Sequence, residues 1–257
     1  MRRKTLTKSN KISYLDNEKD GQALVCLHGH FGCASMFTFL ENEYSGRLIL
    51  IDQRGHGYSD HCQTYRTDDY INDLKEVLQV ERVANPIILG HSLGGVNAYH
   101  YASKYGNVKA LIIEDIGTQV NCSNEFIKNL PNEFNSLYDI EVAFEKIDMK
   151  LDQYFLESIS YDGLHWKFLF DYDGMVISQK EMNGIHWKYW DDLSCPVLLM
   201  HGTKSWACET KNIKEMKKRN KNTFLKIFDG VGHTIRDERR TEYIATIKEF
   251  LKQIESD

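Results

Sequence analysis

The serine at position 92 stands in a sequence that suits a catalytic nucleophile. Residues 86–95 read PIILGHSLGG, so an apolar run leads into a G-x-S-x-G pattern and then into a helical sequence. In this pattern a strand turns sharply into a helix, and the glycines leave room for the strained backbone of the serine. Its hydroxyl then stands above a sheet edge, where N–H groups at the helix start face a developing oxyanion. A glycine turn that binds phosphate or is purely structural is the alternative.

A serine nucleophile needs a base, and the sequence holds ten histidines. His233 stands out, because it follows the last predicted strand in FDGVGHTIRDE, a glycine-bearing loop before the final helix. A base on such a loop can reach a serine at the same sheet edge. We therefore predict that His233 activates Ser92, the alternative being a histidine that only stabilises its loop. Four others lie in glycine-flanked turns and are expected to shape them: His28, His56, His91 and His201.

A second N–H donor for an oxyanion is predicted after the strand near residue 28. The segment ALVCLHGHFG ends in H-G-x-x-G, and its glycines let the backbone bend toward the serine. We expect the backbone N–H groups of Leu93 and His30 to form the oxyanion hole, with that of Phe31 as the next candidate.

These residues need a sheet to position them, and short apolar runs alternate with amphipathic stretches along most of the chain. This alternation is typical of βα units and a mostly parallel sheet. Strands are predicted over 23–28, 47–52, 86–90, 109–115, 196–202 and 224–229, with an antiparallel edge strand at 12–16. Helices are predicted over 68–80, 94–105, 209–219 and 241–254. The last helix should pack on the sheet through one apolar face: Tyr243, Ile244, Ile247, Phe250, Leu251 and Ile254.

The alternation stops over residues 118–189, which are rich in aromatic residues. A structureless loop of this length is uncommon in a compact domain. We therefore predict an α/β core made of residues 1–117 and 190–257 and a helical lid, or cap, over 118–189. Most lid aromatics should form a small core of their own. Phe31 and Trp206 are candidates for the wall of a substrate pocket.

Composition is that of a globular protein and argues against several other classes. The 257 residues are 42% hydrophobic and 12% aromatic, enough for a large core. The formal net charge of −5 gives no reason to expect a nucleic-acid or membrane partner. The polar start is not that of a signal peptide, and no two of the six cysteines form a C-x-x-C pair. We expect a cytoplasmic monomer or homodimer with reduced thiols and no metal site.

Three patterns together resemble the α/β-hydrolase superfamily: HGHFG at 28–32, DQRGHGYSD at 52–60 and GHSLGG at 90–95. Their order and spacing, with the C-terminal histidine, match across nearly the whole chain outside the predicted lid. The resemblance implies an α/β fold with an eight-stranded, mostly parallel sheet flanked by helices, and a lid inserted after strand six. It also implies no cofactor and hydrolysis through an acyl-enzyme on serine.

The expected position of the triad acid holds a different residue. Most members of the superfamily carry an aspartate after strand seven, but here the segment reads HGTKSWACE and Ser205 stands at that place. Serine cannot stabilise an imidazolium as a carboxylate does. Asp115 is the best replacement, because it ends the strand KALIIED beside the nucleophile strand, and LIIEDIG resembles small bacterial serine esterases whose acid follows strand six. The alternatives are Glu209, Glu114, a degraded triad, and a purely structural helix cap at Asp115.

The predicted function is the hydrolysis of carboxylic esters with small or medium acyl groups, so the expected partner is a small-molecule ester. In this hypothesis His233 deprotonates Ser92 and Asp115 orients His233. Two alternatives stay open: a C–C bond hydrolase or lyase that uses the same triad, and a ligand-binding protein with vestigial catalysis.

Overall fold

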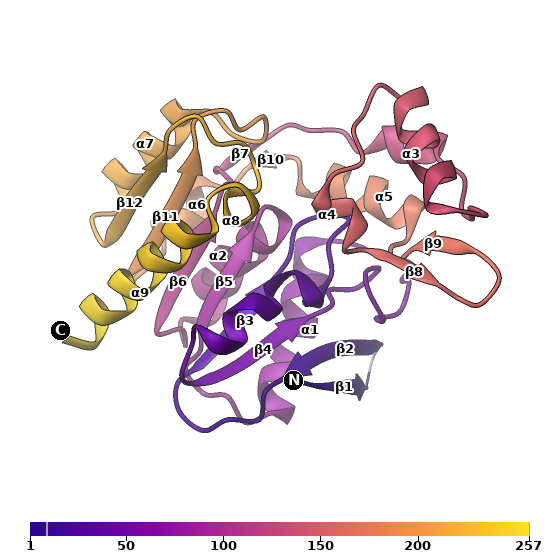
Figure 1. The fold of residues 1–257 in the computed structure, drawn as a ribbon. Helices are drawn as coiled ribbons and strands as arrows, with labels where there is room; N and C mark the ends of the chain where they lie inside the picture. Colours follow the sequence, from indigo (N-terminus) through magenta and orange to yellow (C-terminus); the bar gives the residue numbers. More distant parts are fainter. Residues whose placement is uncertain (9, 257) are drawn as a thin grey trace.

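The computed structural model describes residues 1–8 and 10–256 and is built around an eight-stranded sheet (Figure 1). The strand order is β1-β2-β4-β3-β5-β6-β11-β12. The two pairs that involve β2 are antiparallel, and the other neighbouring pairs are parallel. The predicted fold class is therefore confirmed. The strands are β1 (Arg2–Thr7), β2 (Lys11–Asp16), β3 (Ala23–Leu27), β4 (Arg47–Ile51), β5 (Ile87–His91), β6 (Ala110–Glu114), β11 (Val197–Gly202) and β12 (Thr223–Phe228).

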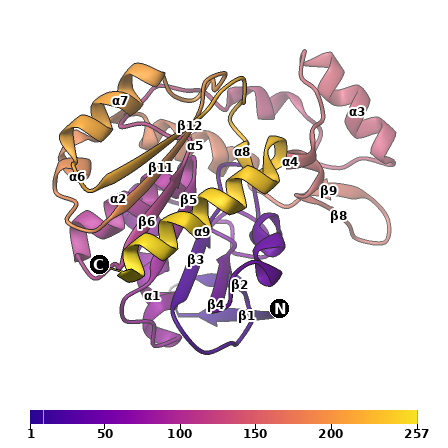
Figure 2. The ribbon, with the colours of Figure 1, turned by 60° about the vertical axis from the view of Figure 1, so that its left-hand side comes forward.

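Helices cover both faces of this sheet (Figures 1 and 2). One face packs against α1 (Thr67–Val80), α2 (Leu93–Tyr105) and α7 (Thr210–Arg219). The other packs against the 3-10 helix η1 (Ala34–Asn42), the short α8 (Ile235–Glu238) and α9 (Arg240–Ser256), which Figure 2 shows in yellow across the strands. Because both faces are covered, the central strands are apolar at nearly every position instead of alternating. Two hydrophobic cores result, one on each face.

The last helix confirms its predicted apolar face. Tyr243, Ile247 and Phe250 are buried against the sheet, and the remaining three predicted residues are partly buried in the same core. By contrast, the predicted edge strand at 12–16 is not at the edge, because β1 pairs with it on the outer side. The sequence prediction missed β1, since Leu6 is the one buried residue of that strand and no apolar alternation marks it.

Residues 118–189, here called the insertion, lie between β6 and β11 and stand beyond one end of the sheet (Figure 1). The insertion supplies most of a third hydrophobic core, which includes Phe134, Phe144, Phe155 and Phe168 and is shared with Phe31, Cys33 and Met36 from the segment after β3. It is not purely helical, because two short antiparallel strand pairs occur in it. Its elements are β7 (Gln119–Val120), η2 (Glu125–Asn129), α3 (Leu137–Lys146), α4 (Gln153–Leu156), β8 (Ile159–Tyr161), β9 (Trp166–Phe168), α5 (Tyr172–Met182), β10 (Gly184–Ile185) and the start of α6 (Trp187–Asp191).

Helix α6 crosses the predicted boundary between insertion and core. Its Trp190 is fully buried and belongs to the hydrophobic core that includes α2. The indole N–H donates to the carbonyl of Met216 in α7 over 2.9 Å. The last helix of the segment therefore packs as part of the core. In the described residues, no helix is both long and apolar enough to cross a bilayer.

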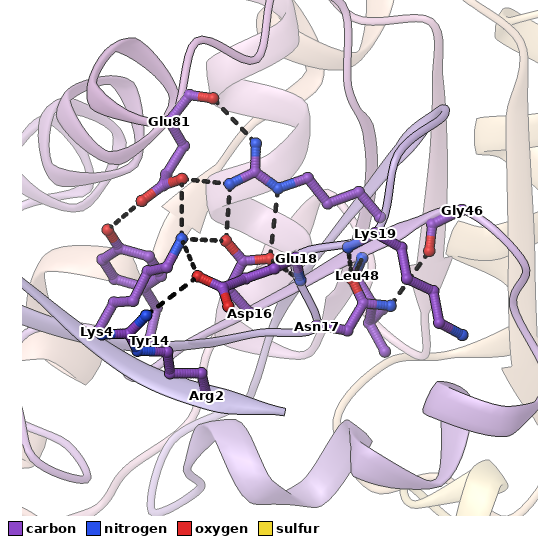
Figure 3. Close-up of polar contacts among 11 residues, drawn as sticks. Arg2, Lys4, Tyr14, Asp16, Asn17, Glu18, Lys19, Gly46, Leu48 and Glu81 are labelled. Atoms are coloured by element: carbon purple, nitrogen blue, oxygen red, sulfur yellow. Dashed lines mark hydrogen bonds and ion pairs between the residues drawn. The ribbon is translucent and has the colours of Figure 1, made fainter.

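A partly buried ionic cluster around Asp16 joins the antiparallel strands to the rest of the sheet (Figure 3). The Asp16 carboxylate accepts from Lys4 over 2.8 Å and from Arg47 over 2.6 Å, which joins β1, β2 and β4. Glu81, at the end of α1, contacts Arg47 and accepts from the Tyr14 hydroxyl over 2.6 Å. Burial alone would raise the pKa of Asp16, but the hydrogen bonds from Arg47 and Lys4 outweigh it and lower that pKa to about 2.

Candidate active site

Ser92 occupies the turn between β5 and α2 in a strained conformation. Its φ of 52° and ψ of −118° lie where residues with a side chain are rare. Gly94 makes this turn possible, because a Cβ atom there would collide with the carbonyl group of Leu27 in β3. The backbone N–H of Ser92 donates to the carbonyl of Glu114 over 3.0 Å, which fixes the turn beside β6. The sequence prediction of a strand, a tight turn and a helix at Ser92 agrees with this arrangement.

Asp115 follows β6 directly and lies beside His233. Its backbone is also strained, with a φ of 53°, and its side chain is fully buried. The Nδ1–H group of His233 donates to Asp115 Oδ2 over 2.7 Å. Asp115 Oδ1 accepts from the backbone N–H of Gly202 over 3.0 Å and from His201 Nδ1 over 2.8 Å. The structure therefore brings the predicted acid and base together.

The alternative acids lie elsewhere. Glu114 is buried in an ion pair with Arg236, with 3.1 Å between Oε2 and Nη1, and accepts from the Tyr243 hydroxyl. Glu209 is exposed and precedes α7. Ser205, at the usual position of the acid, accepts from the N–H of Ala207 over 3.1 Å.

The environment of Asp115 keeps its carboxylate ionised. Burial alone would raise its pKa, but hydrogen bonds from His201 and His233 outweigh burial and lower the pKa of Asp115 to about 2. An ionised Asp115 only accepts hydrogen bonds, so the proton of a neutral His233 stays on Nδ1. Nε2 of His233 is then free to act as a base.

His201 is a member of this network that the sequence interpretation missed. It is not in a loop but at the end of β11, where its side chain is buried. Its Nδ1 contacts Asp115, and its Nε2 lies 2.8 Å from the Thr210 hydroxyl. The order of the strands could have indicated this position. Because β11 pairs with β6 and Met200 lies opposite Glu114, the next residues, His201 and Asp115, lie side by side. The residue types alone do not predict this contact.

Asp115, His201 and Cys208 are the one group in the described chain with metal-ligating atoms gathered within 4.8 Å of one another. Their atoms already contact each other: Cys208 Sγ lies 3.8 Å from Asp115 Oδ1 and 3.6 Å from His201 Nδ1. Burial raises the pKa of the Cys208 thiol far above its usual value, so it keeps its proton at neutral pH. The three side chains therefore suit a hydrogen-bonded network better than a metal site.

His233 lies in the loop after β12, close to the nucleophile turn. Its backbone carbonyl accepts from His91 Nε2 over 3.1 Å. Its ring centroid lies 4.7 Å from that of Trp206. No hydrogen bond joins Ser92 Oγ to His233 among residues 1–8 and 10–256, yet both side chains line one cavity.

The two backbone segments predicted to form an oxyanion hole lie beside Ser92. Leu93 is the first residue of α2, so its N–H has no acceptor within the helix. The loop after β3 approaches closely, because a Cβ atom on Gly29 would lie 3.0 Å from Ser92 Cβ. His30 follows in this loop, and Phe31 turns the chain with a φ of 66°. In the part of the chain that is described, the N–H groups of Leu93 and His30 donate to no other residue.

The cavity at Ser92 has a volume of about 500 Å³ and lies between the core and the insertion. Both predicted pocket residues line it: Phe31 is buried, whereas Trp206 is 70% exposed and therefore lies at the rim. The insertion contributes mostly apolar and aromatic side chains, among them Val120, Phe126, Tyr154, Phe155 and Met182. The described lining holds no lysine or arginine, but it includes the carboxylates of Asp152 and Glu238.

Comparison with known proteins identifies the family. Residues 22–239 match a family model described as alpha/beta hydrolase fold. The chain is 23% identical over 266 residues to proline iminopeptidase PfmaB of Pestalotiopsis fici. The aligned region covers 91% of this chain and 93% of that protein. Its fold is similar to that of E-2-(acetamidomethylene)succinate hydrolase, with a TM-score of 0.83, 18% identity and coverage of 98% and 99%. It is also similar to an esterase of a marine microorganism, with a TM-score of 0.80, 21% identity and coverage of 94% and 100%.

These proteins are hydrolases by name, and the family match spans most of the chain, including the segments that carry Ser92, Asp115 and His233. The resemblance inferred from the three sequence patterns is confirmed at the level of the superfamily. The chain belongs to the alpha/beta hydrolase fold family.

Proposed function

We propose that this protein is a serine hydrolase that cleaves carboxylic esters with small or medium acyl groups. One observation carries the proposal: Ser92 stands in a strained turn on a cavity that also receives His233, whose Nδ1 lies 2.7 Å from Asp115. A nucleophile, a base and an acid that orients the base are the parts that acyl transfer requires.

In the proposed reaction, His233 Nε2 takes the proton of Ser92 as the serine oxygen attacks the ester carbonyl. The N–H groups of Leu93 and His30 stabilise the oxyanion of the tetrahedral intermediate. The intermediate collapses to an acyl-serine, and the alcohol leaves with the proton from His233. Water, deprotonated by His233, then attacks the acyl-serine and releases the acid. Asp115 stabilises the imidazolium in both halves of the cycle.

The substrate-free geometry is compatible with this cycle. Catalytic hydrogen bonds are often long or absent in free enzymes and form when substrate binds. Ser92 and His233 line the same cavity, so we expect their hydrogen bond to form when substrate binds.

The cavity lining favours esters without negative charge. A substrate carboxylate held in a mostly apolar cavity needs a cationic partner. The described lining supplies none, and Asp152 and Glu238 would repel an anion. This argues against a C–C hydrolase or lyase that acts on carboxylate substrates. The intact contact between Asp115 and His233 argues against vestigial catalysis.

Hydrolysis of p-nitrophenyl esters from acetate to dodecanoate tests the proposal. We expect kcat/KM to be highest for short or medium chains, because the cavity is small and closed on one side by the insertion. Ser92→Ala should lower kcat/KM by at least about 10³-fold, since it removes the nucleophile. A fluorophosphonate should label wild-type Ser92 and leave the variant unmodified. No turnover together with no labelling would rule out the proposed function.

A further inference from the structure

Two residues that line the cavity beside Ser92 each carry a buried polar atom that has no hydrogen-bond partner among the described residues. These atoms are the hydroxyl oxygen of Tyr154, in α4 of the insertion, and Nδ1 of His91. Both residues line the cavity, with side chains that are less than one tenth exposed. A buried polar group without a partner is costly and therefore uncommon, so two at one place indicate a site that a ligand completes.

The Tyr154 hydroxyl and His91 Nδ1 both lie close to Gly29. A Cβ atom on Gly29 would lie 2.8 Å from the Tyr154 hydroxyl, 2.8 Å from His91 Nδ1 and 3.0 Å from Ser92 Cβ. A Cβ atom on Gly32 would also lie 2.8 Å from the Tyr154 hydroxyl. The tyrosine therefore rests against the glycine loop after β3, the loop that also carries the proposed oxyanion donor His30.

Protonation makes Tyr154 the hydrogen donor of the pair. His91 Nε2 lies 3.1 Å from the carbonyl of His233, and a carbonyl only accepts, so the imidazole proton is on Nε2. Burial lowers the pKa of His91 well below its usual value, which keeps the ring neutral and leaves Nδ1 as an acceptor. Burial raises the pKa of Tyr154 far above its usual value, so the phenol keeps its proton.

Arg236 holds the tyrosine ring in place. Its guanidinium carbon lies 5.4 Å from the centroid of the Tyr154 ring, a cation–π arrangement. Arg236 itself is buried and paired with Glu114, next to the triad acid. Because Arg236 follows His233 by three residues, one buried cation links the loop of the base to this part of the insertion.

We propose that Tyr154 is a catalytic residue: its hydroxyl donates a hydrogen bond to the ester oxygen that becomes the oxyanion at Ser92. The inference rests on the proposed function and extends it, because the insertion would then supply a side-chain donor alongside the two backbone N–H groups. Such a donor raises the rate only if its bond strengthens as charge develops on the oxygen. A tyrosine that merely packs against the loop would act on stability instead.

The test compares Tyr154→Phe with a matched control, Tyr138→Phe. Tyr138 also belongs to the insertion, but it is 70% exposed and does not line the cavity. With the best p-nitrophenyl ester, Tyr154→Phe should lower kcat by about 10- to 100-fold and change KM by less than about two-fold. It should weaken binding of a trifluoromethyl ketone, which forms a tetrahedral oxyanion on serine, by a similar factor. Tyr138→Phe should change neither quantity.

Thermal unfolding separates this result from misfolding. The Tyr154 hydroxyl has no hydrogen-bond partner in the part of the chain that the structure describes, so Tyr154→Phe should unfold at the wild-type temperature or above it. A folded Tyr154→Phe protein with wild-type kcat and wild-type affinity for the ketone would overturn the inference while leaving the proposed function intact. A wild-type protein with neither turnover nor labelling of Ser92 would overturn both.

Discussion

At the scale of single residues, Asp115 is the centre of the site. One carboxylate oxygen binds the proposed base His233, and the other binds His201 and the N–H of Gly202. Charge-assisted hydrogen bonds of this kind are strong and directional, so they fix the carboxylate in position. His201 thus acts on the proposed base through Asp115 and is a positioning residue.

Removing the side-chain donor at position 201 should slow the reaction. We expect His201→Leu to lower kcat by about 10-fold with little change in KM, because one charge-assisted hydrogen bond to Asp115 is lost. His201→Asn, whose amide nitrogen can replace Nδ1 as the N–H donor to Asp115, should recover part of that loss. Steady-state kinetics give kcat and KM for both variants, and circular dichroism confirms that they are folded. Wild-type kcat in a folded His201→Leu protein would show that Asp115 needs no such support.

Local sequence patterns were enough to select Ser92, His233 and Asp115 as candidate site residues. Ser92 lies in a glycine turn, and His233 and Asp115 each follow a predicted strand. Tyr154 and His201 could not be predicted in this way. Their positions depend on which strand ends and which part of the insertion pack together, and no short pattern encodes that packing.

At the scale of elements, the end of the insertion is anchored by a pair of buried histidines. His100 in α2 and His186, just before α6, lie 2.9 Å apart between Nε2 and Nδ1. His186 Nε2 also lies 2.8 Å from the carbonyl of Met182, and the Tyr189 ring stacks on His100 with centroids 3.6 Å apart. The strand pair β7–β10 brings the two ends of the insertion together nearby.

This pair should make the protein less stable in acid. Burial lowers the pKa of His100 to about 3 and also lowers that of His186. An unfolded histidine titrates near pH 6.5, so between about pH 6.5 and 3 the unfolded chain binds more protons than the folded one. The contribution of this pair to the free energy of unfolding is thus fully present above about pH 6.5 and is lost as the pH falls toward about 3. At pH 5, His100 alone should account for about 2 kcal/mol of lost unfolding free energy.

Urea unfolding at pH 7.5 and pH 5 measures this loss. His100→Gln cannot titrate, so its unfolding free energy should fall less between the two pH values than that of the wild type. His61→Gln serves as the control, because the His61 side chain is 62% exposed. If His100→Gln loses as much stability as the wild type, the pair does not couple pH to folding.

Periodicity predicted the long elements but not the short ones. The parallel strands and the helices that cover them carry apolar runs or faces long enough to detect, as in α9. Apart from α3 and α5, the insertion consists of helices and strands of a few residues each, such as α4 and β8, which are too short for a repeating apolar pattern to be recognised. Its aromatic content indicated a packed unit, whereas its internal arrangement depends on tertiary contacts.

At the scale of the whole molecule, the strand order of the sheet brings the residues of the candidate site together. The carboxyl ends of β3, β5, β6 and β12 lie at one edge of the sheet, and each leads into a segment that contributes to the site. Ligand sites in open α/β sheets commonly form at this edge. The insertion leaves the sheet after β6, at the same edge, and closes the cavity from the other side.

The most direct test of the account is the rate at which a fluorophosphonate labels the protein, followed by peptide mass spectrometry. Wild-type protein should carry the adduct on Ser92. Asp115→Asn should slow labelling by at least about 10²-fold, because it removes the ionised partner of His233, whereas Glu209→Gln should label at the wild-type rate. An adduct absent from Ser92, or a rate that falls in Glu209→Gln and not in Asp115→Asn, would contradict the account.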